Sequence, residues 1–263
     1  MKKTTLAAFA LALGLGVQAP AQANLNVLWY NGIHDPFSGQ EDASLPNPGA
    51  GDPSTAVWNI THWYDGSSMP SGSFNVLVIG SESGSAPGSL LSNLPTFGNR
   101  EFITGQDADF HLTFGPGATN FDGPRGFLRD AINWAGAGTG LGLVLLSPGE
   151  GAISLSSLGI TGISGDSGGT ESVVIPGAFA GFPINTNLTS AGLSNWHTSS
   201  HDNWTSVSSA WTGINTDGGS GFVTLVSADS AGGGIAGTPE PASLALIGAG
   251  LAGLAAVRRR KKA

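Results

Sequence analysis

Cysteine is absent from this 263-residue chain. Its absence excludes disulfide bonds, thiolate metal sites and a cysteine nucleophile. Any folded domain must therefore be stabilised by its apolar core and its hydrogen bonds alone. Glycine and proline are plentiful, at 42 and 15 residues, so we expect much of the surface to be loop.

Positive charge is also scarce between the two ends of the chain. Residues 24–238 contain no lysine and three arginines, Arg100, Arg125 and Arg129. They contain seventeen of the eighteen acids, and three positive against seventeen negative charges give a formal net charge of −14, compared with −8 for the whole chain. Such a field repels nucleic acid, and it repels anionic polysaccharide unless divalent cations bridge the two. We predict no nucleic-acid partner and no cofactor, although the acids leave room for a weakly bound divalent cation with unknown ligands.

Long apolar runs are few, and the first lies near the N-terminus. Two lysines precede an apolar run over residues 6–17, and Ala21-Gln22-Ala23 follows it. A positive segment, a short apolar segment and a small-x-small cleavage site make up a secretory signal peptide. We therefore predict a signal peptide over residues 1–23 and a mature chain that begins at Asn24.

The second apolar run lies near the C-terminus, over residues 242–257, and five cations follow it at 258–262. As a helix it would span about 24 Å, slightly less than the roughly 30 Å hydrocarbon core of a bilayer. Flanking arginines and lysines can make up the difference by reaching to the interface. We predict a transmembrane helix over 242–257 with its cations in the cytoplasm. A buried core helix is the alternative, which five adjacent cations disfavour.

Pro239-Glu240-Pro241 stands before this apolar run, and Arg258, Arg259 and Arg260 follow it. The order resembles the PEP-CTERM sorting signal of Gram-negative bacteria, here covering residues 239–263. The resemblance implies recognition by an exosortase, a membrane protease-transpeptidase that would cut near Pro239-Glu240-Pro241. It also implies a precursor transiently anchored in the inner membrane, delivery to the cell surface or beyond, and an association with exopolysaccharide and biofilm.

The exported part alternates between strand-like and helix-like patterns. Continuous apolar runs predict strands over 25–30, 74–80, 100–105, 141–146 and 222–226. Helical spacing predicts helices after Asp52-Pro53, over 85–94 and over 125–135. The alternation favours an α/β domain over 24–226, with a parallel-rich sheet and helices on both faces. A β-sandwich is the alternative, and residues 227–238 are expected to be a linker.

The segment FITGQDADFH, with the glycine-rich loop and helix after it, resembles the class I glutamine amidotransferase-like, flavodoxin-like group. The resemblance implies the same parallel α/β architecture. Amidotransferase activity is not implied, because this chain has no cysteine to act as nucleophile.

Ligands bind beyond the carboxyl ends of strands in an open parallel sheet, and here a strand ends just before Asp107. In an extended chain Asp107, Asp109 and His111 would share one side. Arg125 begins the next predicted helix, whose free N–H groups favour anions. We predict a small pocket formed by Asp107, Asp109, His111 and Arg125. The alternative is that the two aspartates are loop residues paired with arginine and that His111 is an ordinary polar side chain.

Other candidates are weaker. His197 and His201 have the i, i+4 spacing of helical metal ligands, but HTSSHD lacks the glutamate of an HExxH motif. Ser81 lies in GSESGS, which is no GxSxG elbow. Tryptophans 196, 204 and 211 would suit sugar stacking if exposed, although burial is the commoner role.

Two functions follow from these patterns. The first is a non-catalytic protein of the cell surface or extracellular matrix, sorted by an exosortase. The second is an exported hydrolase or carbohydrate-processing enzyme with an Asp/His site at the end of a central strand. A carbohydrate-binding module is a third interpretation, and it requires coplanar, exposed tryptophan rings.

Overall fold

The computed structural model describes residues 24–32, 57–81, 88–112, 121–148 and 153–228. The predicted signal peptide and sorting tail lie outside the described residues. Within those residues, no helix has the length and apolar character needed to cross a bilayer. The expected membrane helix at 242–257 lies outside the part searched.

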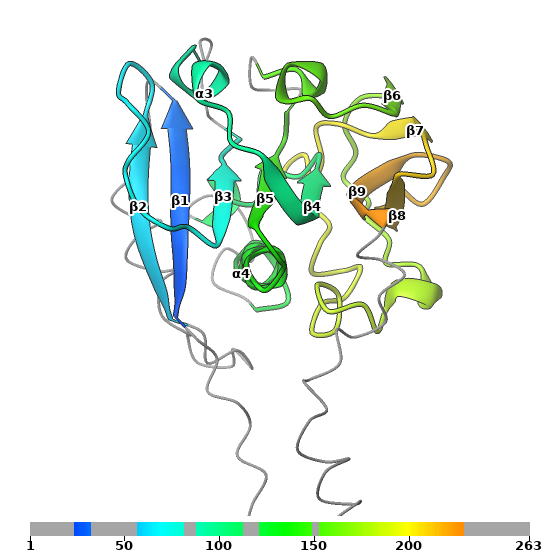
Figure 1. Cartoon of the computed structure of the whole chain (residues 1–263). Helices are drawn as coiled ribbons and strands as arrows, with labels where there is room; N and C mark the ends of the chain where they lie inside the picture. Colours follow the sequence, from blue (N-terminus) through cyan, green and yellow to red (C-terminus); the bar gives the residue numbers. More distant parts are fainter. Residues whose placement is uncertain (1–23, 33–56, 82–87, 113–120, 149–152, 229–263) are drawn as a thin grey trace, which may run out of the picture.

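Nine strands form one mixed sheet in the order β2-β1-β3-β5-β4-β9-β7-β6, with β8 paired to β9 (Figure 1). The strands are β1 (Leu25–Gly32), β2 (Trp58–Tyr64), β3 (Val76–Ile79), β4 (Phe97–Thr104), β5 (Leu141–Leu146), β6 (Ile163–Asp166), β7 (Trp204–Val207), β8 (Trp211–Thr216) and β9 (Phe222–Ser227). The helices are α3 (Gly88–Ser92) and α4 (Pro124–Gly136), with 3₁₀ turns η1 (Phe110–Leu112), η2 (Leu155–Leu158) and η3 (Gly177–Phe179).

The first five strands run parallel to one another. They are the near-continuous apolar runs that a sheet covered on both faces requires. In β3 all four residues are buried, and in β5 five of six are buried. The predicted strands in this half correspond to β1, β3, β4 and β5, and β9 corresponds to the late run at 222–226.

The expected helix after Asp52-Pro53 is wrong over its described part, because residues 58–64 form strand β2. Trp58, Ile60, His62 and Tyr64 alternate with Asn59, Thr61 and Trp63 along this strand. A β-branched residue resists helix because its χ1 freedom is lost against the preceding turn. In the structure, the main-chain groups of this segment pair with β1, where Leu25 lies opposite Trp58. These inter-strand hydrogen bonds take the place of the intrahelical ones.

The expectation of a parallel sheet with helices on both faces is also wrong. Strand β9 pairs antiparallel with β4, and it pairs with β7 and β8 in the same sense, so the sheet is mixed. The alternative of a β-sandwich fails for the described part of the chain as well, because its nine strands belong to one sheet. Strands β6, β7 and β8 lie in the serine- and glycine-rich region, where the apolar pattern is too weak to predict them. Ser227, where the linker was expected to begin, belongs to β9, and residues 229–238 lie outside the described residues.

Among the described residues, a long helix covers only one face of the sheet. Helix α4 is seen nearly end-on in Figure 1, at the lower ends of β3 and β5. Its residues Phe127, Leu128 and Ile132 are fully buried in a core with Val27 and Val144 of the sheet. The opposite face is covered by short pieces, since Leu90 of the one-turn helix α3 and Leu158 of η2 pack there. These short segments bury the apolar side chains of this face, because Leu158 and its neighbours Ile153 and Ile160 pack directly against the strands.

Helix α4 lies so close to β5 that one strand position has no room for a side chain. A Cβ added to Gly142 would lie 2.4 Å from the carbonyl oxygen of Ala135 and 3.1 Å from its Cβ. Both obstructing groups belong to a helix packed into the core, so neither can swing away as the end of a flexible side chain could.

Gly142→Ala should therefore lower the free energy of unfolding by about 1–3 kcal/mol, the usual cost of overpacking. Urea unfolding of the full chain would measure the change. Gly181→Ala is the matched control, because an added Cβ there meets nothing within 4 Å. Equal stability of the two variants would contradict the close packing of α4 on β5.

Candidate functional site

Strand β4 ends at Thr104, and the chain then turns instead of continuing extended. The amide of His111 donates to the carbonyl oxygen of Asp107 at 3.2 Å, and residues 110–112 form η1. The turn separates side chains that an extended strand would hold on one side. It brings Asp107 and His111 together, four residues apart, and directs Asp109 elsewhere.

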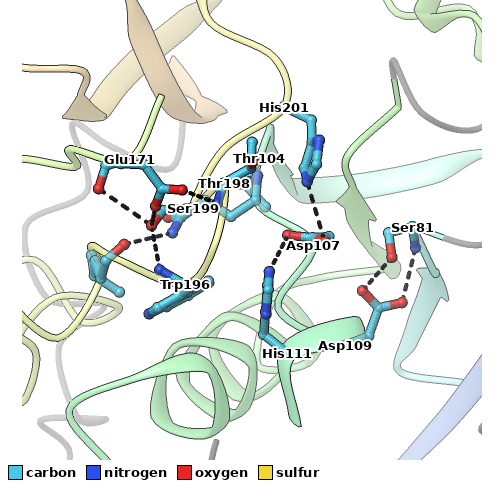
Figure 2. Close-up of polar contacts among 12 residues, drawn as sticks. Ser81, Thr104, Asp107, Asp109, His111, Glu171, Trp196, Thr198, Ser199 and His201 are labelled. Carbon is cyan, nitrogen blue, oxygen red and sulfur yellow. Dashed lines mark hydrogen bonds and ion pairs between the residues drawn. The ribbon is translucent and has the colours of Figure 1, made fainter. Parts of the chain in front are cut away.

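Asp107 lies between two histidines, as Figure 2 shows. His111 Nε2 lies 3.3 Å from Asp107 Oδ1, and His201 Nε2 lies 3.3 Å from Asp107 Oδ2. Asp107 and His111 are buried, whereas the His201 side chain is 22% exposed. Both distances are longer than the ~2.7–2.9 Å usual for a charge-assisted hydrogen bond.

The pKa of Asp107 lies below its ordinary value. Burial disfavours the charged carboxylate, but hydrogen bonding to His111 and His201 and the charges of these rings outweigh it. The carboxylate is therefore ionised inside the protein, because the two histidines offset the cost of burying its charge.

Asp109 points away from the histidines to Ser81, just beyond the end of β3. Its Oδ2 accepts from the Ser81 amide at 2.9 Å, and its Oδ1 accepts from the Ser81 hydroxyl at 2.7 Å. Burial raises the pKa of Asp109 to about 6, although the two bonds from Ser81 oppose the shift. Gly80 permits this approach, because a Cβ there would lie 2.8 Å from Asp109 Oδ2.

The four predicted site residues are thus only partly brought together. Asp107 and His111 pair directly, and Asp109 lies beside them with a separate partner. Arg125 is half-buried on α4, with its guanidinium carbon 5.6 Å from the ring centre of Phe121. In place of the expected arginine, His111 and His201 contact Asp107.

The sequence suggested His201 only as one of two possible metal ligands, and it did not predict the contact with Asp107. Its amide donates to the carbonyl oxygen of Gly105 at 2.7 Å, which brings its loop onto the end of β4. Gly105 has no side chain to prevent this: a Cβ there would lie 2.0 Å from the Asp202 carbonyl oxygen. His197 is exposed, and the segment is not helical, so the i, i+4 spacing brings no two imidazoles together.

Metal binding has no support in the described part of the chain. No group of three or more histidine, aspartate or glutamate side chains there is arranged to hold a metal ion. Asp107 uses both of its oxygens on imidazole nitrogens. A carboxylate held in this way can orient two rings and fix which of their nitrogens bears a proton.

Ser147 is a residue that the sequence analysis did not single out. It follows β5 directly, is fully buried, and has φ 38°, which a residue with a side chain rarely adopts. Its hydroxyl has no hydrogen-bond partner within the described residues. Because β5 lies between β3 and β4, Ser147 lies between the strand ends that lead to Ser81 and Asp107. A serine after a buried apolar strand, followed by proline, was the only sequence signal.

The tryptophans do not form a surface for sugar stacking. Trp196 is 1% exposed and Trp204 is 4% exposed, so both are core residues. Trp211 is half-buried and donates from Nε1 to the carbonyl oxygen of Thr161 at 2.9 Å. The requirement of the carbohydrate-binding-module interpretation, coplanar and exposed rings at these positions, is not met.

The lowered pKa of Asp107 predicts a pH-dependent effect of Asp107→Asn. The charged form contributes stability above its unfolded pKa of about 3.9 and loses it as pH falls through the folded pKa. The variant should be about 2–4 kcal/mol less stable than wild type near neutral pH, because it removes the charge that the buried His111 and the partly exposed His201 contact. The deficit should shrink at acid pH, as measured by urea unfolding at several pH values.

Asp109→Asn is the matched control. Its carboxyl has a raised pKa, so in wild type its contribution is present at low pH and is lost as pH rises to about 6. This variant should therefore gain stability relative to wild type between about pH 4 and 7. A deficit of Asp107→Asn that stays constant from acid to neutral pH would contradict the ionised Asp107.

Comparisons with known proteins identify only the C-terminal end of the chain. The family model described as the PEP-CTERM protein-sorting motif matches residues 238–261. No curated protein and no solved structure matches the chain significantly, so the likeness to flavodoxin-like proteins is not supported. The matched residues include Pro239, Glu240 and Pro241 and the cations 258–260, all outside the described residues. The chain is therefore an exported protein that carries a PEP-CTERM motif and is sorted by an exosortase in the membrane.

Proposed function

We propose that this exosortase substrate is a non-catalytic component of the cell surface or the extracellular matrix, associated with exopolysaccharide or biofilm. The observation that carries the proposal is the sorting motif at residues 238–261. The motif accounts for the last part of the chain, and everything between it and the signal peptide is the cargo.

The charge of residues 24–238 limits the partners that this part of the chain can have in a matrix. Residues 24–238 hold three arginines and seventeen acids, which favours solubility and disfavours contact with anionic polymers. Its partner in a matrix is therefore a neutral polysaccharide, or an anionic one bridged by divalent cations.

The contacts at the end of β4 support a structural role for the Asp/His cluster. Asp107 engages both histidines, and Asp109 engages the amide and hydroxyl of Ser81. A carboxylate poised for general acid or base chemistry must instead reach a substrate proton. These contacts join segments that lie far apart in the sequence and so stabilise the fold.

Exosortase processing has a direct test. Deleting the exosortase gene in a producing strain should leave the full-length chain in the membrane fraction, and wild-type cells should release a shorter form. Replacement of Pro239, Glu240 and Pro241 by alanine should give the same retention in cells with an intact exosortase. Unchanged release in both strains, measured by immunoblotting of fractions, would refute sorting through this tail.

A second candidate, an exported hydrolase, is favoured by one observation. Ser147 combines a left-handed backbone with a buried hydroxyl that lacks a partner within the described residues, at the carboxyl end of a central strand. Strained residues of this kind gather at active sites, and nucleophilic serines occupy sharp turns after strands.

A fluorophosphonate probe decides whether this candidate holds. If Ser147 is a nucleophile, the full chain should be labelled covalently, and Ser147→Ala should lose the label. Ser208→Ala should keep it, since Ser208 is an exposed serine elsewhere. Mass spectrometry of the labelled peptide gives the position. An unlabelled wild-type protein would remove the hydrolase from consideration.

A further inference from the structure

An open depression of about 330 Å³, called the cavity below, lies at the surface away from the Asp107 cluster, between two segments of the C-terminal half. One wall is the segment that contains Glu171, Val173 and Val174, and the other contains Ser190, Ser194 and Asn195. Its volume is at the lower end of the range of small-molecule sites. The cavity therefore has room for a small ligand, such as one unit of a longer chain.

Hydrogen bonds between the two segments fix the shape of the cavity. The amide of Val173 donates to Ser194 Oγ at 2.9 Å, and the amide of Ile175 donates to Ser190 Oγ at 2.9 Å. The Val174 amide pairs with the Thr216 carbonyl oxygen in β8 at 2.8 Å, which ties this wall to the sheet. The cavity is preformed, so a ligand would not have to order its walls.

Asn195, at the edge of the cavity, begins a loop with a strained backbone. Asn195, His197 and Thr198 have φ values of 65°, 72° and 95°. Asparagine tolerates such a conformation, but for a β-branched threonine it is a genuine outlier. Strain of this kind persists only where the surroundings enforce it, and it gathers at ligand sites.

Glu171 both lines the cavity and enforces the strain. Its carboxylate accepts from the Thr198 amide and from Ser199 Oγ, as Figure 2 shows, and its carbonyl oxygen accepts from the Asn195 amide at 3.0 Å. A carboxylate has about four lone-pair sites. Glu171 is exposed, so its oxygens can accept further hydrogen bonds from a ligand that donates.

The lining chemistry points to the class of ligand. Val173, Val174 and Ala191 offer an apolar surface, while the amide of Asn195 and the carboxylate of Glu171 offer polar groups. No arginine or lysine lines the cavity, and Glu171 repels anions. A pyranose ring has an apolar C–H face and hydroxyls that donate to carboxylate and amide oxygens. We infer that this cavity binds one unit of a neutral saccharide, with Glu171 and Asn195 contacting its hydroxyls.

This inference deepens the proposed function, because it names the surface that would contact a matrix polysaccharide. It also connects the cavity to the Asp107 cluster. Trp196 of the strained loop donates from Nε1 to the Gly192 carbonyl oxygen at 2.8 Å, and its ring centre lies 5.7 Å from that of His111. The position of the loop is therefore set from both sides, by Glu171 and by the packing of Trp196 on His111.

Saturation-transfer NMR on the full chain in mild detergent tests the inference, with D-glucose, D-galactose, D-mannose and N-acetyl-D-glucosamine as probes. At least one should give saturation transfer, and Ala191→Trp should reduce its affinity at least tenfold by filling the cavity. Ala210→Trp is the matched control, since Ala210 is an exposed alanine outside the cavity. Asn195→Gly should also weaken binding, because glycine keeps the left-handed backbone and removes only the amide.

Co-sedimentation of the same protein with exopolysaccharide of the producing strain tests the proposed function separately. Co-sedimentation without any response to the monosaccharides, or with Ala191→Trp binding them as wild type does, would overturn the cavity assignment alone. Monosaccharide binding without co-sedimentation would overturn the matrix role and retain the cavity. A response to galacturonate or glucosamine as strong as that to the neutral sugars would overturn the neutral class.

Discussion

Strand β4 is the constraint on which the rest of the structure depends, because both halves of the sheet are built on it. One edge pairs parallel with β5 and the other pairs antiparallel with β9. Thr104 marks the seam, since its hydroxyl contacts the Val223 carbonyl oxygen at 3.2 Å and the Thr224 hydroxyl at 3.1 Å. All three groups are fully buried or main-chain, so these polar contacts must be satisfied within the protein. Whatever follows β4 is thereby placed where the two halves meet.

The parallel half was predictable because its strands are buried on both faces and read as apolar runs. Helix α4 was predictable too, since its apolar residues recur at helical spacing between a proline and a glycine-rich end. Strand β2 was not, because its residues fit a helix nearly as well and only pairing with β1 decides the matter. Strands β6, β7 and β8 are half-exposed and rich in serine, threonine and glycine, so their pairing depends on distant partners that no local pattern reveals.

The candidate site shows the same division between local and distant information. Proximity of Asp107 to His111 follows from a turn in one short segment, although the sequence suggested an extended one. Contact with His201 crosses about half of the exported chain and depends on Gly105, where a side chain would exclude the incoming loop. Arg125 was included for its charge and its place at the start of the next helix, and neither indicates that its guanidinium packs against Phe121. The strain at Ser147 and at residues 195–198 is a backbone property, which residue types alone do not display.

The scarcity of lysine and arginine affects how easily proteases outside the cell can cut the exported domain. Trypsin-like proteases cut after lysine or arginine, and residues 24–238 offer only three such bonds. Arg100 lies within β4 and donates to the Trp134 carbonyl oxygen at 2.7 Å, while Arg125 and Arg129 lie within α4. A protease needs several residues of extended, accessible chain, so none of these bonds can be cut unless the sheet or its helix opens first. The exported domain is in this way poor in targets for one common class of extracellular enzyme.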